Sequence, residues 1–187
     1  MLTNNYFLYR RMMFTDETTQ MTSCIGVVFD ARAHKSYNHD LAGTYRSTVQ
    51  FGEMTSDRMP EYSSQVANVY PGTYFGTGKT PASADDLKLE SVITSGLSAR
   101  SGGYSIFKEA PGRYVFELRY ELTNITDANI TINEMGIVRP IPSGEINSPL
   151  YHPVLFDRTV CTEPVVIEPN ETRLVVYRII FNQSQDV

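Results

Sequence analysis

A regular alternation of side chains over residues 113–123 constrains this chain more than any other feature of its sequence. In RYVFELRYELT, large apolar residues take every second position, and charged residues take most of the others. Successive side chains of a β-strand point to opposite faces, so this period predicts a strand with one buried and one solvated face. A single strand cannot cover its own apolar face, so a second layer must pack on it. That face carries Tyr114, Phe116, Leu118, Tyr120 and Leu122.

Further segments of strand character surround this one. Residues 129–138 begin with Ile130 on the inward face and continue with Met135 on it, and this change of phase predicts a β-bulge at residues 133–134. Residues 173–181 (RLVVYRIIF) are apolar on both faces apart from one arginine, which predicts a central strand. Repeated strands with turn residues between them are typical of an antiparallel sandwich or barrel.

The segments between these strands contain turn and helix signals. Proline after Thr80, with acidic residues in the following turn, predicts one short helix over residues 81–89. Residues 98–103 (SARSGG) and 140–149 are expected to be loops, and Glu168-Pro-Asn-Glu is expected to form a type I turn. Near the start of the chain, the short apolar run Tyr6–Tyr9 suits a strand.

These patterns predict a mainly β protein, an antiparallel β-sandwich of jelly-roll or immunoglobulin-like type with one short helix and an N-terminal arm. We expect the β-sandwich domain to occupy residues 72–187, and residues 1–71 to form an N-terminal arm and first strands. The first 60 residues show no dominant period. They are either an arm that packs on neighbours or simply the first strands of the sandwich.

Charge and hydropathy disfavour two classes of partner. The net charge is −5 and no basic run exceeds the pair Arg10–Arg11, so the sequence offers no patch for the phosphates of nucleic acid. No apolar run approaches the roughly 18–20 residues that span a membrane, and the N-terminus does not resemble a signal peptide. We therefore expect synthesis in a cytoplasm, where Cys24 and Cys161 stay as thiols rather than a bridge. Asn124-Ile-Thr126 matches the acceptor pattern for N-glycosylation, but a protein that is not secreted does not meet the glycosylating enzyme. We therefore expect these residues to form a turn.

Signals for catalysis or cofactors are weak. Gly76-Thr-Gly-Lys-Thr80 resembles the end of a phosphate-binding loop, but Thr73 stands where that motif needs glycine, and proline follows. His34 and His39 lie near acidic residues in spacings that match no strong metal template. No Ser or Cys near His152 lies in a nucleophile-elbow motif, so the sequence shows no catalytic triad. We predict that the protein is not an enzyme and has no cofactor, no catalytic residues and no metal site.

Three aromatic residues next to glycine turns are the candidate site residues. Tyr70, Tyr74 and Phe75 could be exposed as a protein interface or as stacking platforms for a sugar, or they could fold back onto the core. The sequence leaves these alternatives open, with the core or a protein interface favoured over a sugar platform.

Three stretches together resemble a known family. They are GTGKTPASADDLKLESVITSG (76–96), YVFELRYELTNITDANITINEMGI (114–137) and VLFDRTVCTEPVVIEPNETRLVVYRIIF (154–181). In this order they are similar to a pattern of virion structural proteins of tailed bacteriophages, and the match spans roughly residues 72–182. Ala82 stands where the pattern has a second proline, Cys161 where an aliphatic residue is usual, and Asn170 where glycine is common.

This resemblance implies a structural component of a phage particle. We expect several copies to assemble through protein contacts at the tail, the neck as a head-tail connector, or the capsid, after assembly in the host cytoplasm. The expected partners are other virion structural proteins and further copies of the chain in a homo-oligomer, with no nucleic acid and no membrane. The alternative is a carbohydrate-binding or receptor-binding module of a tail tip, with Tyr70, Tyr74 or Phe75 as platforms.

Overall fold

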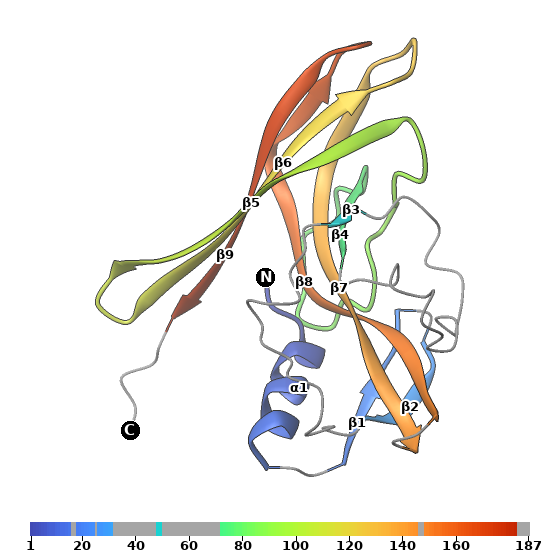
Figure 1. Cartoon of the computed structure of the whole chain (residues 1–187), viewed down its shortest axis with the longest axis vertical. Helices are drawn as coiled ribbons and strands as arrows, with labels where there is room; N and C mark the ends of the chain where they lie inside the picture. Colours follow the sequence, from blue (N-terminus) through green and yellow to red (C-terminus); the bar gives the residue numbers. More distant parts are fainter. Residues whose placement is uncertain (16–17, 25, 32–47, 50–71, 146–147, 183–187) are drawn as a thin grey trace.

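The structure is a computed structural model, and it describes residues 1–15, 18–24, 26–31, 48–49, 72–145 and 148–182. The protein is mainly β, with antiparallel sheets and an N-terminal helix, α1 (Asn4–Thr15), as Figure 1 shows. The predicted fold class is therefore confirmed. The strands are β1 (Thr19–Thr22), β2 (Val28–Ala31), β3 (Thr48–Val49), β4 (Gly72–Gly76), β5 (Leu97–Ala110), β6 (Arg113–Asn124), β7 (Ile130–Glu145), β8 (Ser148–Ile167) and β9 (Thr172–Asn182).

The larger sheet is built around the long hairpin of β7 and β8. These two strands pair antiparallel along almost their whole length, from Ile130 opposite Ile167 to Glu145 opposite Ser148. The other edge of β7 pairs with β4 and, further along, with β2, giving the order β1-β2-β7-β4-β3. The β3–β4 pair is parallel. The remaining strands of the sheet are thus joined to this hairpin, β2 and β4 directly through β7, and β1 and β3 through β2 and β4.

The smaller sheet has the order β5-β6-β9, so the strand predicted from the alternation at 113–123 lies at its centre. The prediction of a central β9 is wrong, because β9 is an edge strand in this sheet. Its second apolar face is exposed at Leu174, Val176 and Ile180, while Val175, Tyr177 and Ile179 are buried. Apolar residues on both faces of β9 therefore do not indicate a central strand here, because one of these faces is exposed to solvent.

The outer face of β6 is less solvated than the alternation predicts. Val115 and Glu117 are both buried. Val115 lies between its register partners Phe107 on β5 and Ile180 on β9. Glu117 accepts a hydrogen bond from Arg178 Nε at 2.8 Å, and Arg178 is its own register partner. Side chains of the neighbouring strands thus cover a face that the sequence of β6 alone predicts to be exposed to solvent.

The main core lies between the two sheets. Phe116, Leu118, Tyr120 and Leu122 of β6 face it, whereas Tyr114 is partly exposed at the far end of the strand. From the larger sheet, Ile132, Met135 and Ile137 point into the same core. The register shift between Ile132 and Glu134 confirms the predicted bulge. Because of this bulge, even-numbered residues face the core before it and odd-numbered residues face it afterwards.

Helix α1 replaces the strand expected at Tyr6–Tyr9. Its contacts are tertiary: Asn4 N donates to Ala84 O at 2.8 Å, and Asn5 Nδ2 donates to Thr22 O at 2.9 Å. The Tyr9 ring packs on Phe156, within a second core that also contains Met21, Phe29, Ala31, Ile141 and Val154. The helix sequence has little periodicity of its own, so packing rather than local propensity stabilises it.

The helix expected over residues 81–89 is not present. This segment forms a turn in which Asp86 N donates to Ser83 O at 3.2 Å, and then runs on without regular structure. Leu89 is buried in a third apolar cluster with Cys24, Tyr74, Val138 and Leu155. Of the acidic residues that suit a helix start, Asp85 accepts a hydrogen bond from Asn4 Nδ2 at 2.7 Å, and Asp86 accepts one from the Arg158 guanidinium at 2.9 Å.

Two expected loops are strands, and one turn differs in type. Residues 98–103 belong to β5, with a register shift between Ser101 and Gly103. Within 140–149, the described residues 140–145 and 148–149 continue β7 and β8. In the 168–171 turn, Asn170 has a positive φ of 60°, which fits a type II rather than a type I turn. The same φ explains why glycine is common at this position in the resembling pattern.

The described part of residues 1–71 is integrated with the larger sheet. β1 pairs with β2, and Ala31 of β2 pairs with Ser143 of β7. Within residues 32–71, the structure describes residues 48–49, which form β3. The boundary at residues 71–72 stays a prediction. Among the described residues, no helix has the length and apolar character needed to cross a membrane.

Candidate functional site

A buried ion pair links β7 and β8 to the loop over residues 77–91. Arg158 Nε lies 2.8 Å from Glu134 Oε2, and both side chains are almost fully buried. The Arg158 guanidinium also donates to Asp86 Oδ2 at 2.9 Å and to Thr80 O at 3.1 Å. Burial by itself would lower the pKa of Arg158, but the bonds to Asp86 and Glu134 outweigh it and raise the pKa.

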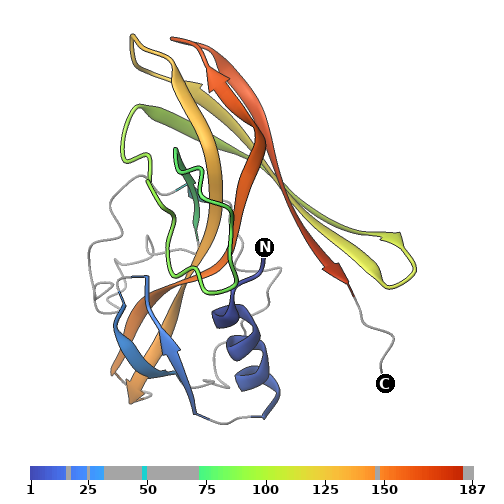
Figure 2. The same ribbon diagram turned by 180° about the vertical axis from the view of Figure 1, so that it is seen from behind.

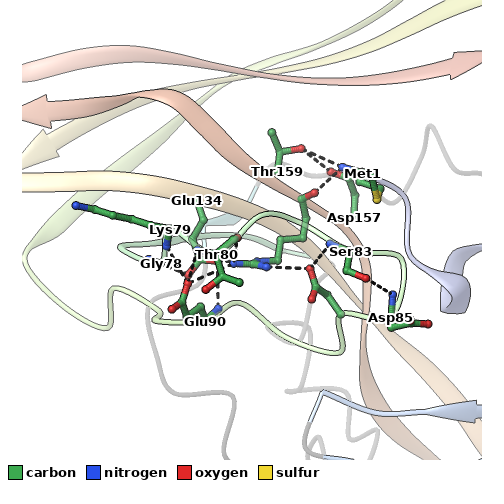
Figure 3. A network of polar contacts seen from close by, with 12 residues as sticks. Met1, Gly78, Lys79, Thr80, Ser83, Asp85, Glu90, Glu134, Asp157 and Thr159 are labelled. Atoms are coloured by element: carbon green, nitrogen blue, oxygen red, sulfur yellow. Dashed lines mark hydrogen bonds and ion pairs between the residues drawn. The ribbon is translucent and has the colours of Figure 1, made fainter.

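The loop wraps its backbone N–H groups around carboxylates (Figure 3). Glu134 accepts hydrogen bonds from Gly78 N at 3.2 Å and from Ser91 N at 2.8 Å. Glu90 Oε2 accepts from the N–H groups of Lys79 and Thr80, each at 2.8 Å. The backbone bond from Thr80 is the largest cause of the lowered pKa of Glu90. Charge-assisted bonds of this kind are stronger than neutral ones, so they hold the loop on the sheet.

This geometry explains the Gly-Thr-Gly-Lys-Thr motif without a nucleotide. A Cβ at Gly78 would lie 2.5 Å from Glu134 Oε1, and a Cβ at Gly76 would lie equally close to it. The glycines therefore let the backbone approach a glutamate of the same chain. The N–H groups of Gly78, Lys79 and Thr80 that could have held a phosphate are occupied by carboxylates.

Asp157, the neighbour of Arg158 on β8, is a second buried acid. Asp157 accepts a hydrogen bond from the Tyr177 hydroxyl, and its Oδ2 lies 3.2 Å from the Met1 ammonium. Burial, followed by the charge of Asp157, raises the pKa of Tyr177 well above its ordinary value. Sequence reasoning missed both acid clusters. Glu134 and Asp157–Arg158, charged residues inside otherwise apolar strands, are the signal that could have found them.

The candidate platform residues are not on the surface where the structure describes them. Tyr74 is 8% exposed and Phe75 is 1% exposed. Tyr74 packs with Leu89 and Leu155, and Phe75 packs edge-on against Tyr120 in the main core. The sugar-platform alternative is therefore wrong for these two side chains, and they belong to the core. Tyr70 lies outside the described residues.

The other chemical candidates form no site in the described residues. His34 and His39 lie outside them, and no group of three His, Cys, Asp or Glu side chains within them could hold a metal ion. His152 is buried and its ring stacks on Phe29. Cys24 and Cys161 are both free thiols; Cys24 is buried and Cys161 is half-buried. Asn124 forms the expected turn, since its Oδ1 accepts a hydrogen bond from Thr126 N at 2.9 Å.

An exposed apolar surface and an adjoining pocket are the strongest candidates for an interaction site. The β5–β6 hairpin and the end of β9 project away from the β7–β8 hairpin (Figures 1 and 2). We call these residues, 104–114 and 178–182, the blade. On the face that continues from the main core, the blade exposes Tyr104, Ile106 and Tyr114. On the opposite face it exposes Phe107 and Ile180.

A pocket of about 130 Å³ lies where the blade meets helix α1. Its walls come from six elements, α1 and β5 to β9. The carboxyl group of Asp157, also in the wall, is already bonded to Tyr177 and the Met1 ammonium. A pocket of this character suits an apolar group rather than a charged ligand. The main apolar side chains that line it are Tyr6, Ile106, Phe116, Phe156, Ile179 and Phe181.

The edges of the blade are also open. Within the described residues, β5 and β9 each pair with β6 alone, so each has one edge without a strand partner. Unpaired edges combined with exposed apolar side chains can be covered by another chain. In comparisons with known proteins, no family model matches this sequence, and neither a curated protein nor a solved structure is significantly similar to it.

Proposed function

We propose that this protein is a structural component of a tailed bacteriophage virion, which assembles in multiple copies through protein contacts. The observation that carries the proposal is the blade, a three-stranded projection with exposed apolar side chains on both faces and open edges. In a many-copy assembly, neighbouring subunits can cover surfaces of this kind. Its partners in this proposal are other virion proteins and further copies of the chain, in the tail, neck or capsid.

The resemblance in the sequence supports the proposal from a second direction. The pattern residues that looked like separate motifs meet in one place, because the glycine loop, Glu134 and Arg158 form a single bonded network. Such a network is a scaffold, since its polar groups bond to one another and leave the loop held on β7. This arrangement supports a stable building block. Tyr74 and Phe75 are buried, so these two side chains offer no platform for the carbohydrate-binding alternative.

Mass spectrometry of gradient-purified particles tests the proposal. A virion component co-purifies with the particles in a constant ratio to their major protein across the gradient, whereas a contaminant does not. Absence from intact particles would overturn the proposal. Cryo-microscopy of the same particles then identifies the ring or surface that the protein occupies.

Incorporation of blade variants tests the observation that carries the proposal. Changing Tyr104 and Tyr114 together to serine removes exposed aromatic surface from the blade. We expect this variant to fold but to be depleted from particles. The matched control is Val28→Ser, which changes a comparably exposed apolar residue on β2. Equal incorporation of both variants would show that the blade is not the contact.

A further inference from the structure

The pocket beside the blade has a basic rim. Arg10 lies on helix α1, close enough to Tyr6 of the pocket wall for its charge to act on that hydroxyl. Lys108 lies on the pocket-side face of the blade, opposite Tyr114 and two residues from Ile106. Both side chains are exposed, and neither has a carboxylate partner among the described residues. A ligand that fills this pocket would gain from carrying negative charge around its apolar part.

The opposite end of the molecule has the complementary character. Ile125 projects from the β6–β7 loop and is 64% exposed, the highest value among the described large apolar residues. Asp127 lies in the same loop, and Glu168 lies in the adjoining turn, which is attached through the bond from Asn170 N to Asn124 O at 3.0 Å. Both carboxylates are exposed and lack a cationic partner among the described residues.

The two features cannot meet within one chain. Phe116 of the pocket and Ile125 are separated along β6 by nine residues of extended strand, or about 30 Å. Figure 1 shows the β6–β7 and β8–β9 turns at one end of the molecule, and the blade tip and α1 toward the other. Any contact between them therefore joins two molecules.

The volume of the pocket also agrees with the size of an isoleucine side chain. An apolar cavity of about 150 Å³ holds a benzene molecule, which has six carbon atoms. The pocket of about 130 Å³ therefore has room for the four-carbon side chain of an isoleucine. We propose that Ile125 of one copy inserts into the pocket of the next copy, while Asp127 and Glu168 face Arg10 and Lys108.

This contact is heterologous, because it joins two different surfaces of the same protein. Repetition of such a contact generates a ring if the rotation closes and a filament if it does not. The inference deepens the proposed function and rests on it for its biological meaning, since it makes the neighbouring subunit in the particle a second copy. It can nevertheless be tested on the purified protein alone.

Two exposed positions allow each side of the contact to be removed without opening a core. Ile125→Asp removes the inserting side chain, and Ile106→Glu places a negative charge at the pocket mouth, where Asp127 and Glu168 would approach. The matched control is Val28→Asp, a change at a comparably exposed apolar residue on β2. Circular dichroism and thermal melting establish that all three variants keep the wild-type fold.

Analytical ultracentrifugation of the full chain over a concentration series measures the contact. We expect the wild type and Val28→Asp to form species larger than a dimer, and each of the other two variants to self-associate at least about tenfold more weakly. High salt should weaken the wild-type association, because the facing charges are exposed. A monomeric wild type at millimolar concentration, or one that stops at a dimer, would overturn the inference.

Mixing the two variants gives the sharpest outcome. Ile125→Asp keeps an intact pocket and Ile106→Glu keeps an intact Ile125, so an equimolar mixture can form one contact but cannot extend it. We expect heterodimers and nothing larger. A mixture that stays monomeric would contradict the inference, and so would one that forms long oligomers.

Zero-length carbodiimide cross-linking checks the charged partners. In a mixture of isotope-labelled and unlabelled wild type, we expect mixed-label cross-links from Lys108 to Asp127 or Glu168. Their absence from an associating sample would mean that another surface mediates the association. Failure here leaves the virion proposal intact if the protein is found in particles, whereas absence from particles leaves a measured head-to-tail contact intact.

Discussion

Arg158 and Glu134 form an ion pair inside the protein, with Arg158 Nε 2.8 Å from Glu134 Oε2, and the β-bulge of β7 makes this pair possible. Without the bulge, Glu134 would share the inward face of Ile132 and point into the main apolar core. The extra residue turns Glu134 to the other face of the sheet, where the 77–91 loop and Arg158 surround it. A local irregularity of the backbone thus positions the charge that holds the loop.

Loss of Arg158 should destabilise the protein strongly. Arg158→Met leaves Glu134 buried without its cation, and we expect the free energy of unfolding to fall by about 3–5 kcal/mol. Adding Glu134→Gln should recover part of this loss, because the amide oxygen still accepts from the loop without a buried charge. Chemical denaturation measures both variants. The control, Arg100→Met, changes an exposed residue 3.9 Å from Glu121, and should stay within about 0.5 kcal/mol of wild type.

Gly136 and Leu89 should be coupled energetically. A Cβ at Gly136 would lie 2.4 Å from Leu89 Cδ1, in a cluster where Leu89 is buried. We expect Gly136→Ala to lower the free energy of unfolding by about 1–3 kcal/mol through overpacking. Leu89→Ala should lower it by about 2–5 kcal/mol through a cavity. In the double variant the new methyl group occupies that space, so the combined loss should be smaller than the sum. Additive losses in a double-mutant cycle would show that the two sites do not share this space.

Stability should fall at alkaline pH because of buried groups that resist ionisation. Burial raises the pKa of the Cys24 thiol from 9.0 to about 12. Between these values the unfolded chain loses a proton that the folded chain retains, so this contribution is fully present below about pH 9 and is lost as the pH rises. Burial likewise raises the pKa of Tyr74 to about 12, and adds to the effect above pH 10.

The Cys24→Ala variant isolates the thiol in this dependence. Its free energy of unfolding should fall less steeply than that of wild type above pH 9, by up to about 1.4 kcal/mol per pH unit. Denaturation curves at several pH values measure the slope. Cys161→Ala is the control, because Cys161 is only half-buried and its pKa is raised less. Identical slopes for wild type and Cys24→Ala would refute the assignment.

Asn124 should be the structurally important asparagine of its loop. It is fully buried, and its Nδ2 donates to Ala128 O at 2.7 Å and to Ile167 O at 2.9 Å. Asn124→Ala would leave the buried carbonyl group of Ile167 without its donor, which should lower the free energy of unfolding by about 1–3 kcal/mol. The control is Asn129→Ala, which changes an exposed asparagine in the Asn-X-Thr pattern that follows. Its free energy of unfolding should stay within about 0.5 kcal/mol of the wild-type value. Thermal or chemical denaturation distinguishes the two, and equal losses would contradict the prediction.

The sequence by itself determined the features whose cause is local. The alternation over 113–123 predicted β6, because the period of a strand is a property of its own backbone. The phase change at residues 133–134 predicted the bulge, and the pattern at Asn124 predicted its turn. Each of these depends on side chains that are neighbours in sequence.

Tertiary structure decided the features that depend on partners distant in sequence. Residues 4–15 are helical because they pack on β8 and β1. The helix signal at Thr80–Pro81 does not produce a helix, because Arg158 binds the Asp86 carboxylate and Glu134 binds the backbone N–H of Glu90. β9 is apolar on both faces, yet it lies at an edge, because sheet order is set by pairing and not by composition. The pocket, likewise, exists only because six elements meet, so no local pattern in the sequence encodes it.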